Sequence, residues 1–317
     1  MEKRIKTLSF LTTLMMLFVL IGGAIVTKTD SGKACGDTWP LCHGEFIPAF
    51  TISKFIEYSH RYVSGAAGLL LLATTILVWI YIKRKDAKWF SAGAGLFTII
   101  QAYLGAMAAL SEPTSIVKAL HFGISLIAFA FTLLLWLVFT KWGNYNTAEA
   151  AQSLRKMSLG FAAMIWGTLI FTYVAVYFGA YVRHTESSGG CSGWPLCNGE
   201  IIPELTGATG VIFTHRVIAL ALLLYTIVVV RIAVTRFRDI EQVRIGAWWA
   251  LGLLVAQIFS GASVTFTLQS DWYLVTALIH AVLISGLFAI LSYLCVLTIY
   301  AHFAQQLNVS KKNNFRS

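Results

Sequence analysis

Residues 24–48 read AIVTKTDSGKACGDTWPLCHGEFIP, and residues 180–203 read AYVRHTESSGGCSGWPLCNGEIIP. Both stretches contain V-x-x-T-[DE]-S, then a cysteine, and then W-P-L-C-x-G-E-x-I-P. The repetition continues downstream at an offset of 155 to 159 residues, in three further matches. These are Ser59-His60-Arg61 with Thr214-His215-Arg216, Gln101 with Gln257, and His121 with His280. Such an internal repeat predicts two similar structural units, each with its own site.

The composition indicates an all-α membrane protein. The chain has 317 residues, of which 57% are hydrophobic and 12% charged, and its mean hydropathy is +0.73. A soluble domain of this length cannot bury so much apolar surface, whereas apolar stretches of about 20 residues span a bilayer as helices. The first stretch lacks a small-residue cleavage site and is expected to remain as a helix. The eight predicted spans lie at 8–27, 58–82, 89–110, 117–140, 158–182, 212–230, 245–267 and 273–300.

The distribution of basic residues predicts the topology. With the N-terminus inside, 17 of the 24 Lys and Arg fall on the inner side, which places the C-terminus inside as well. The net charge of +10 is therefore a topology signal, and no basic stripe with interleaved aromatics suggests nucleic-acid binding. Four spans per repeat insert both repeats the same way up, as two four-helix bundles related by a pseudo-twofold axis along the membrane normal. The expected units are 1–140 and 158–317, with 141–157 as an inner linker, and the tail from Lys311 is expected to be disordered.

Two cysteine pairs lie in the matching outer loops. Because the outer side of the membrane is oxidising, Cys35–Cys42 and Cys191–Cys197 can each form a disulfide within one loop. Neither pair has the C-x-x-C spacing of thioredoxin-like centres or zinc ribbons. Two interpretations stay open: a structural staple for the Trp-Pro-Leu turn, or a redox-active pair that takes part in chemistry.

Four histidines are predicted at the outer ends of the even-numbered spans. His60 and His215 start the second and sixth spans, while His121 and His280 lie one and two turns into the fourth and eighth. Two histidines at equal depth in each half can hold one heme iron from both faces. The alternative is a set of hydrogen-bonded core histidines. Zinc or copper is a weaker interpretation because no further nitrogen or sulfur ligand recurs at this depth, and the missing C-x-x-C-H motif excludes c-type attachment.

The residues beside these histidines differ between the halves at one position. Arg61 and Arg216 each follow a histidine and are candidate contacts for heme propionates, or else interfacial anchors. Glu57 shares a helix face with His60, whereas its repeat equivalent is Ile212. This asymmetry predicts chemistry in the first half and a retained cofactor in the second. The alternative is an ordinary ion pair between Glu57 and Arg61.

The motifs GGAIVTKTDSGKACGDTWPLCHG, EYSHR, ALHFGIS, GAYVRHTESS and THR resemble those of bacterial heme A synthases of the Gram-positive bacillus type, over essentially the whole chain. The resemblance implies oxidation of the C8 methyl group of heme O to a formyl group, which yields heme A for terminal oxidases. It also implies that His60 and His121 flank the substrate heme O, that His215 and His280 ligate a heme b cofactor, and that Glu57 is the catalytic carboxylate.

The distribution of Lys and Arg predicts a multi-pass protein of the cell membrane with the heme sites and cysteine loops toward the extracytoplasmic side. Heme O synthase and terminal oxidase assembly factors are the expected protein partners, with membrane lipid around the helices. Two other functions are weighed against this one. A diheme b-type carrier linked to quinone predicts two equal sites, which the single Glu57 opposes, and a membrane thiol oxidoreductase needs no repeated histidines.

Overall fold

The chain is all-helical in the computed structural model, which describes the backbone of residues 1–314 and the side chains of 1–145 and 147–306. Eight helices of the described chain are long and apolar enough to cross a membrane, which confirms the predicted fold class. The last helix continues to Asn314, so the expected disorder is wrong as far as that residue, and 315–317 lie outside the described residues. The elements are α1 Glu2–Lys28, α2 Ile52–Tyr81, α3 Lys85–Leu110, α4 Ser115–Val138, η1 Lys141–Asn146, α5 Ala148–Leu154, α6 Leu159–His184, η2 Ser187–Gly189, α7 Gly207–Arg236, α8 Glu241–Thr267 and α9 Tyr273–Asn314.

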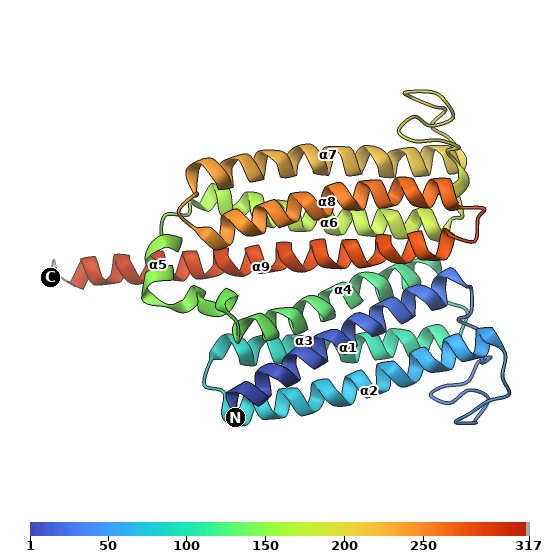
Figure 1. The fold of residues 1–317 in the computed structure, drawn as a ribbon, viewed down its shortest axis with the longest axis horizontal. Helices are drawn as coiled ribbons and strands as arrows, with labels where there is room; N and C mark the ends of the chain where they lie inside the picture. Colours follow the sequence, from blue (N-terminus) through green and yellow to red (C-terminus); the bar gives the residue numbers. More distant parts are fainter. Residues whose placement is uncertain (315–317) are drawn as a thin grey trace.

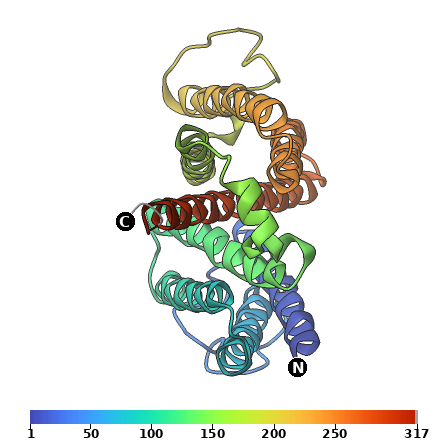
Figure 2. The ribbon, with the colours of Figure 1, turned by 90° about the vertical axis from the view of Figure 1, so that its left-hand side faces the viewer.

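The long helices form two groups that run side by side. Helices α1–α4 pack together in one group and α6–α9 in the other, with both chain termini at the end opposite the two cysteine loops (Figure 1). Viewed from that end, α4 and α9 lie at the centre of the molecule, where they contact each other (Figure 2). The orientation across a membrane and the pseudo-twofold axis stay predictions.

Several helices begin earlier than the hydropathy pattern indicates, among them α2 and α7, which carry candidate histidines. Helix α2 begins at Ile52, where the Thr51 side chain accepts a hydrogen bond from the Lys54 N–H and caps the helix. Helix α7 begins at Gly207, before its predicted start at residue 212. Hydropathy marks only the apolar part of a span, and both helices continue outward into a polar turn. The two histidines expected at the helix starts therefore lie well inside their helices.

Residues 141–157, predicted to be a polar linker, fold into η1 and α5 and pack against α9. The Tyr293 hydroxyl of α9 donates to the Trp142 carbonyl at 2.9 Å. The Gln305 side-chain amide of the same helix donates to the Met157 carbonyl at 2.7 Å. The connection between the two groups of helices is thus anchored to the second group.

The two groups share one apolar core. Its largest cluster of buried side chains includes Leu126 from α4, Ile165 from α6 and Leu287 from α9. At the cysteine-loop end, Arg183 adds a polar contact between the two groups of helices. Its Nη2 donates to Asp30 Oδ1 and to the Thr27 carbonyl, both at 3.1 Å. The apolar contact fixes α4 and α9 side by side, and these two helices each carry one of the candidate ligands.

Candidate functional site

The four histidines lie at comparable depth in helices that all begin at the cysteine-loop end. His60 of α2 and His215 of α7 both come eight residues after the first helical residue, His121 of α4 six and His280 of α9 seven. At 3.6 residues per turn, each is about two turns inside its helix. The expected positions of His60 and His215 at the helix starts, and of His121 one turn in, are therefore corrected, while His280 lies as predicted.

Each imidazole ring packs against a glycine of the preceding long helix. A Cβ atom added to Gly22 of α1 would lie 2.9 Å from His60 Nδ1. The equivalent distances to Cε1 are 3.3 Å from Gly105 to His121, 3.1 Å from Gly179 to His215 and 3.2 Å from Gly261 to His280. Cβ contacts this short force a neighbour to shift, so only glycine leaves the rings where they are. Gly105 and Gly261 are repeat equivalents, and so are Gly23 and Gly179, so the same contact between a glycine and a histidine ring occurs in both halves.

Three of the four rings have no hydrogen-bond partner on Nδ1. The Nδ1 atoms of His60, His121 and His215 are buried without a partner in the described structure. No hydrogen bond between described residues engages Nε2 of these rings either. Buried polar nitrogens are normally hydrogen-bonded, and an unpartnered one calls for an explanation such as a bound group. The three rings therefore have free nitrogens for coordination.

His280 is held differently. Its Nδ1 is 2.8 Å from the Ser260 hydroxyl oxygen, and its Nε2 is 3.0 Å from the side-chain nitrogen of Gln257. Both partners belong to α8, so Gln257 and Ser260 link that helix to α9. Its repeat equivalent Gln101 has a buried Oε1 without a partner.

Each group of helices carries two of the histidines, His60 and His121 on α2 and α4 and His215 and His280 on α7 and α9. Within the residues whose side chains are described, no three His, Cys, Asp or Glu gather as a cluster for a metal ion. Two nitrogen ligands per pair fit a heme iron, whose other four ligands come from the macrocycle. The residues present thus match the donor set of a bis-histidine heme.

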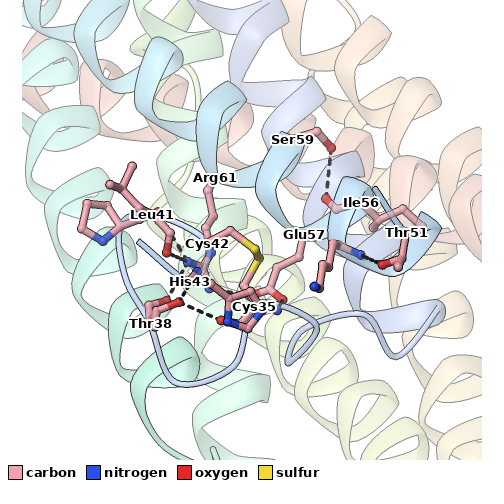
Figure 3. Close-up of a disulfide and its surroundings, with 12 residues drawn as sticks. Cys35, Thr38, Leu41, Cys42, His43, Thr51, Ile56, Glu57, Ser59 and Arg61 are labelled. Atoms are coloured by element: carbon pink, nitrogen blue, oxygen red, sulfur yellow. Dashed lines mark hydrogen bonds and ion pairs between the residues drawn. A yellow bond between two sulfur atoms is a disulfide. The ribbon is translucent and has the colours of Figure 1, made fainter. Parts of the chain in front are cut away.

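The first cysteine loop is tied to α2 by a charged pair (Figure 3). Cys35 and Cys42 form a disulfide with a Cα–Cα distance of 4.8 Å. Arg61 Nη1 donates to the carbonyls of Thr38 at 2.7 Å and Leu41 at 3.0 Å. The guanidinium therefore holds the turn between the cysteines in place.

Glu57 completes this network. Its side chain is buried, with Oε2 accepting from the Cys35 N–H at 2.8 Å and Oε1 pairing with Arg61 Nη2 at 2.5 Å. The ion pair between positions 57 and 61, considered as the alternative role from the sequence, is thus present. Glu57 makes no hydrogen bond to His60 in the described structure. A carboxylate still has acceptor capacity when each oxygen takes one bond, so this pairing leaves room for a further donor.

The second loop has the same frame without the carboxylate. Cys191 and Cys197 form a disulfide with a Cα–Cα distance of 4.7 Å, and Ile212 lies in the same buried apolar cluster. Arg216 Nη1 donates to the Gly193 carbonyl at 2.7 Å and to that of Leu196 at 3.1 Å. Its Nη2 is buried without a partner. Ile212 therefore fills the space that Glu57 occupies in the first half and leaves one guanidinium nitrogen free.

The sequence did not single out Ser260 as a functional residue, because a serine within a membrane helix is ordinary. A signal was present, since the position lies beside Gly261 in the repeat and is occupied by Leu104 in the first half. The glycines of the preceding helices likewise make room for the histidine rings.

The sequence is similar to proteins of one family. The family model COX15-CtaA, described as cytochrome oxidase assembly protein, matches residues 6–52 and 49–292. Among curated proteins, the heme A synthase of Symbiobacterium thermophilum is 40% identical over 94% of this chain and 96% of its own length. The heme A synthases of Alkalihalophilus pseudofirmus and Bacillus licheniformis are 39% and 41% identical, again over 94% of this chain and over 98% and 97% of theirs.

Proposed function

Because this chain belongs to the COX15-CtaA family of cytochrome oxidase assembly proteins, we propose that it is a heme A synthase, an oxidoreductase that converts the C8 methyl group of heme O to a formyl group. The observation that carries this conclusion is identity of about 40% to heme A synthases over nearly the full length of both chains. The paired histidines on eight apolar helices suit a protein that handles a membrane-borne heme.

The two histidine pairs receive different hemes in this proposal. His60 and His121 hold heme O as substrate, and His215 and His280 hold heme b as cofactor. The unpartnered ring nitrogens of His60, His121 and His215 support the use of these three histidines as ligands. The assignment of substrate to the first half is supported by Glu57, because among the residues with described side chains it is the only buried carboxylate on a helix that carries a candidate histidine.

The chain's own residues bind and orient the substrate and handle protons. In the reaction that the family resemblance implies, the methyl group is hydroxylated twice and the resulting geminal diol loses water to give the formyl group. Heme b, when bound, supplies a one-electron redox centre. The four glycines that pack against the histidine rings hold these rings in position, and the shared core keeps α4 beside α9.

Glu57 is the proposed catalytic carboxylate. It is buried about one helical turn from His60 and paired with Arg61, and its remaining acceptor capacity can take a proton as the methyl group is oxidised. Arg61 and Arg216 are proposed contacts for the heme propionates, in addition to their bonds to the loop carbonyls. The free Nη2 of Arg216 supports this role in the second half.

We place the protein in the cell membrane with both cysteine loops on the extracytoplasmic side, where an oxidising environment maintains disulfides. Heme O then comes from a heme O synthase in the same membrane, and heme A passes to terminal oxidase assembly. The positive-inside distribution of Lys and Arg supports this orientation.

The direct test is extraction of heme from cells that express this chain together with a source of heme O. We expect a new heme A peak by chromatography and mass spectrometry, and none with an empty vector. A quinone-linked diheme carrier or a thiol oxidoreductase would yield heme O and heme b alone, so absence of heme A beside well-expressed protein would refute the proposed function.

A further inference from the structure

His280 is the only one of the four candidate ligands, all of them in the described part of the chain, with both ring nitrogens hydrogen-bonded. Its Nδ1 lies 2.8 Å from Ser260 Oγ and its Nε2 lies 3.0 Å from Gln257 Nε2. Both contacts come from α8, one turn apart on the face that packs against α9. The ring is therefore fixed in orientation from two directions.

The contacts favour one tautomer of the His280 ring. The Ser260 hydroxyl donates its proton to the Gln257 backbone carbonyl at 2.8 Å. Its oxygen can then only accept, so Nδ1 of His280 carries a proton and donates to it. In this tautomer Nε2 is unprotonated, and its single lone pair accepts from the Gln257 amide. An unprotonated imidazole nitrogen is the form that binds a metal, so a heme iron coordinated through Nε2 would displace the Gln257 amide while the Ser260 contact on Nδ1 stays in place.

The first half lacks this arrangement because of one side chain. Its repeat equivalent of Ser260 is Leu104, and that of Gln257 is Gln101. The rings themselves pack alike, at 3.3 Å from the Cβ position of Gly105 and 3.2 Å from that of Gly261. A leucine offers no acceptor, which explains why Nδ1 of His121 is buried without a partner.

We propose that Ser260 is a positioning residue that makes the second half retain its heme, and that Leu104 leaves His121 a weaker ligand so that the first half releases its heme. The inference rests on the proposed function, which makes one heme a product and the other a cofactor. A hydrogen bond on the far nitrogen of a ligating histidine fixes the ring and raises its basicity, and its loss costs about 10- to 100-fold in metal affinity. A product must leave after each turnover, whereas a cofactor must stay.

The test is the rate at which the purified full-length protein transfers its heme b to excess apomyoglobin. Ser260→Ala should speed this transfer by about 10- to 100-fold and alter the spectrum of the reduced heme. Ser260→Thr keeps the hydroxyl and should stay close to wild type. Equal transfer rates for wild type and Ser260→Ala would overturn the proposal.

The matched variant in the other half is Leu104→Ser. It should slow transfer of the first-half heme, identified as heme O or heme A after extraction, and leave the heme b rate unchanged. An unchanged first-half rate would refute the role given to Leu104. Heme b transfer is measured without turnover, so it tests the role of Ser260 separately from the proposed function. If Ser260→Ala speeds the transfer but the wild-type protein makes no heme A, only the proposed function is refuted.

Discussion

The two cysteine loops have the same shape and are held by different chemistry. In the first half a buried Glu57 binds both Arg61 and the Cys35 backbone, whereas in the second half Ile212 lies in one buried apolar cluster with the disulfide and Arg216 keeps one nitrogen unpaired. Since the second loop folds without an acid, the fold does not require one at this position. The carboxylate of the first half is therefore available for function.

A second difference between the halves lies one helix away. His280 has a serine partner, and its counterpart His121 faces a leucine position. The first half thus has a buried acid and histidines whose rings have no hydrogen-bond partner. The second half has no acid at the equivalent position and has one histidine, His280, whose ring is hydrogen-bonded. In our proposal, this contrast separates a site for turnover in the first half from a site for retention in the second.

The largest expected effect comes from Glu57→Gln. This change removes the charge and keeps the size and much of the hydrogen bonding, so the first loop should stay folded. Because general acid–base groups contribute about 10²- to 10⁴-fold to rate, we expect heme A output to fall by at least about 100-fold. The heme b spectrum should be unchanged, and heme extracts should be compared with wild type at equal protein.

Ile212→Glu is the matched control. The new carboxylate lies near the free Nη2 of Arg216 and should pair with it without creating a second active site. Near-normal heme A output from Glu57→Gln would mean that Glu57 only holds the first cysteine loop in place. The functional difference that we propose between the two halves would then no longer be supported by Glu57.

Removal of the disulfides should have a smaller effect that differs between the loops. Closing a loop of this length is worth about 2.5 kcal/mol in the chain-entropy model. Without the Cys35–Cys42 bond, the first loop stays tied through Glu57 and Arg61, whereas no carboxylate ties the second. Limited proteolysis should therefore cut the Cys191→Ser/Cys197→Ser loop a few-fold faster than the Cys35→Ser/Cys42→Ser loop. Equal rates would show that the ion pair adds nothing to loop stability.

Substitution of a glycine that packs against a histidine ring should have the smallest effect. Gly179→Ala would bring a methyl group 3.1 Å from His215 Cε1, and such overpacking costs about 1–3 kcal/mol. We expect a reduced ratio of heme b to protein after purification. Gly160→Ala on the same helix is the control, because nothing lies within 4 Å of its Cβ position. An unchanged ratio in Gly179→Ala would mean that the ring has room to move.

Much of this arrangement is readable from the sequence. Hydropathy alone indicates the eight spans, because a helix that crosses lipid must be apolar over a fixed length. The repeat indicates the histidine pairs, since His60, His121, His215 and His280 recur with nearly constant spacing. The contrast between Glu57 and Ile212 is likewise a difference between two aligned letters.

Other features depend on three-dimensional contacts that no spacing encodes. The starts of α2 and α7 were misplaced because a polar helical turn outside the membrane looks like loop. Arg61 follows His60 and invites a role toward heme, yet its guanidinium reaches three loop carbonyls that only the folded turn brings together. The partnership of Ser260 with His280 needs the packing of α8 on α9, which hydropathy does not specify.

The division of labour between the halves is tested most directly by identifying the heme bound to two double variants purified from cells that make heme O. His60→Ala/His121→Ala should retain heme b alone, with no heme O or heme A. His215→Ala/His280→Ala should lack heme b and its low-spin spectrum, retain the ability to bind heme O, and form no heme A. Heme b that persists in the second variant, or disappears from the first, would contradict the account.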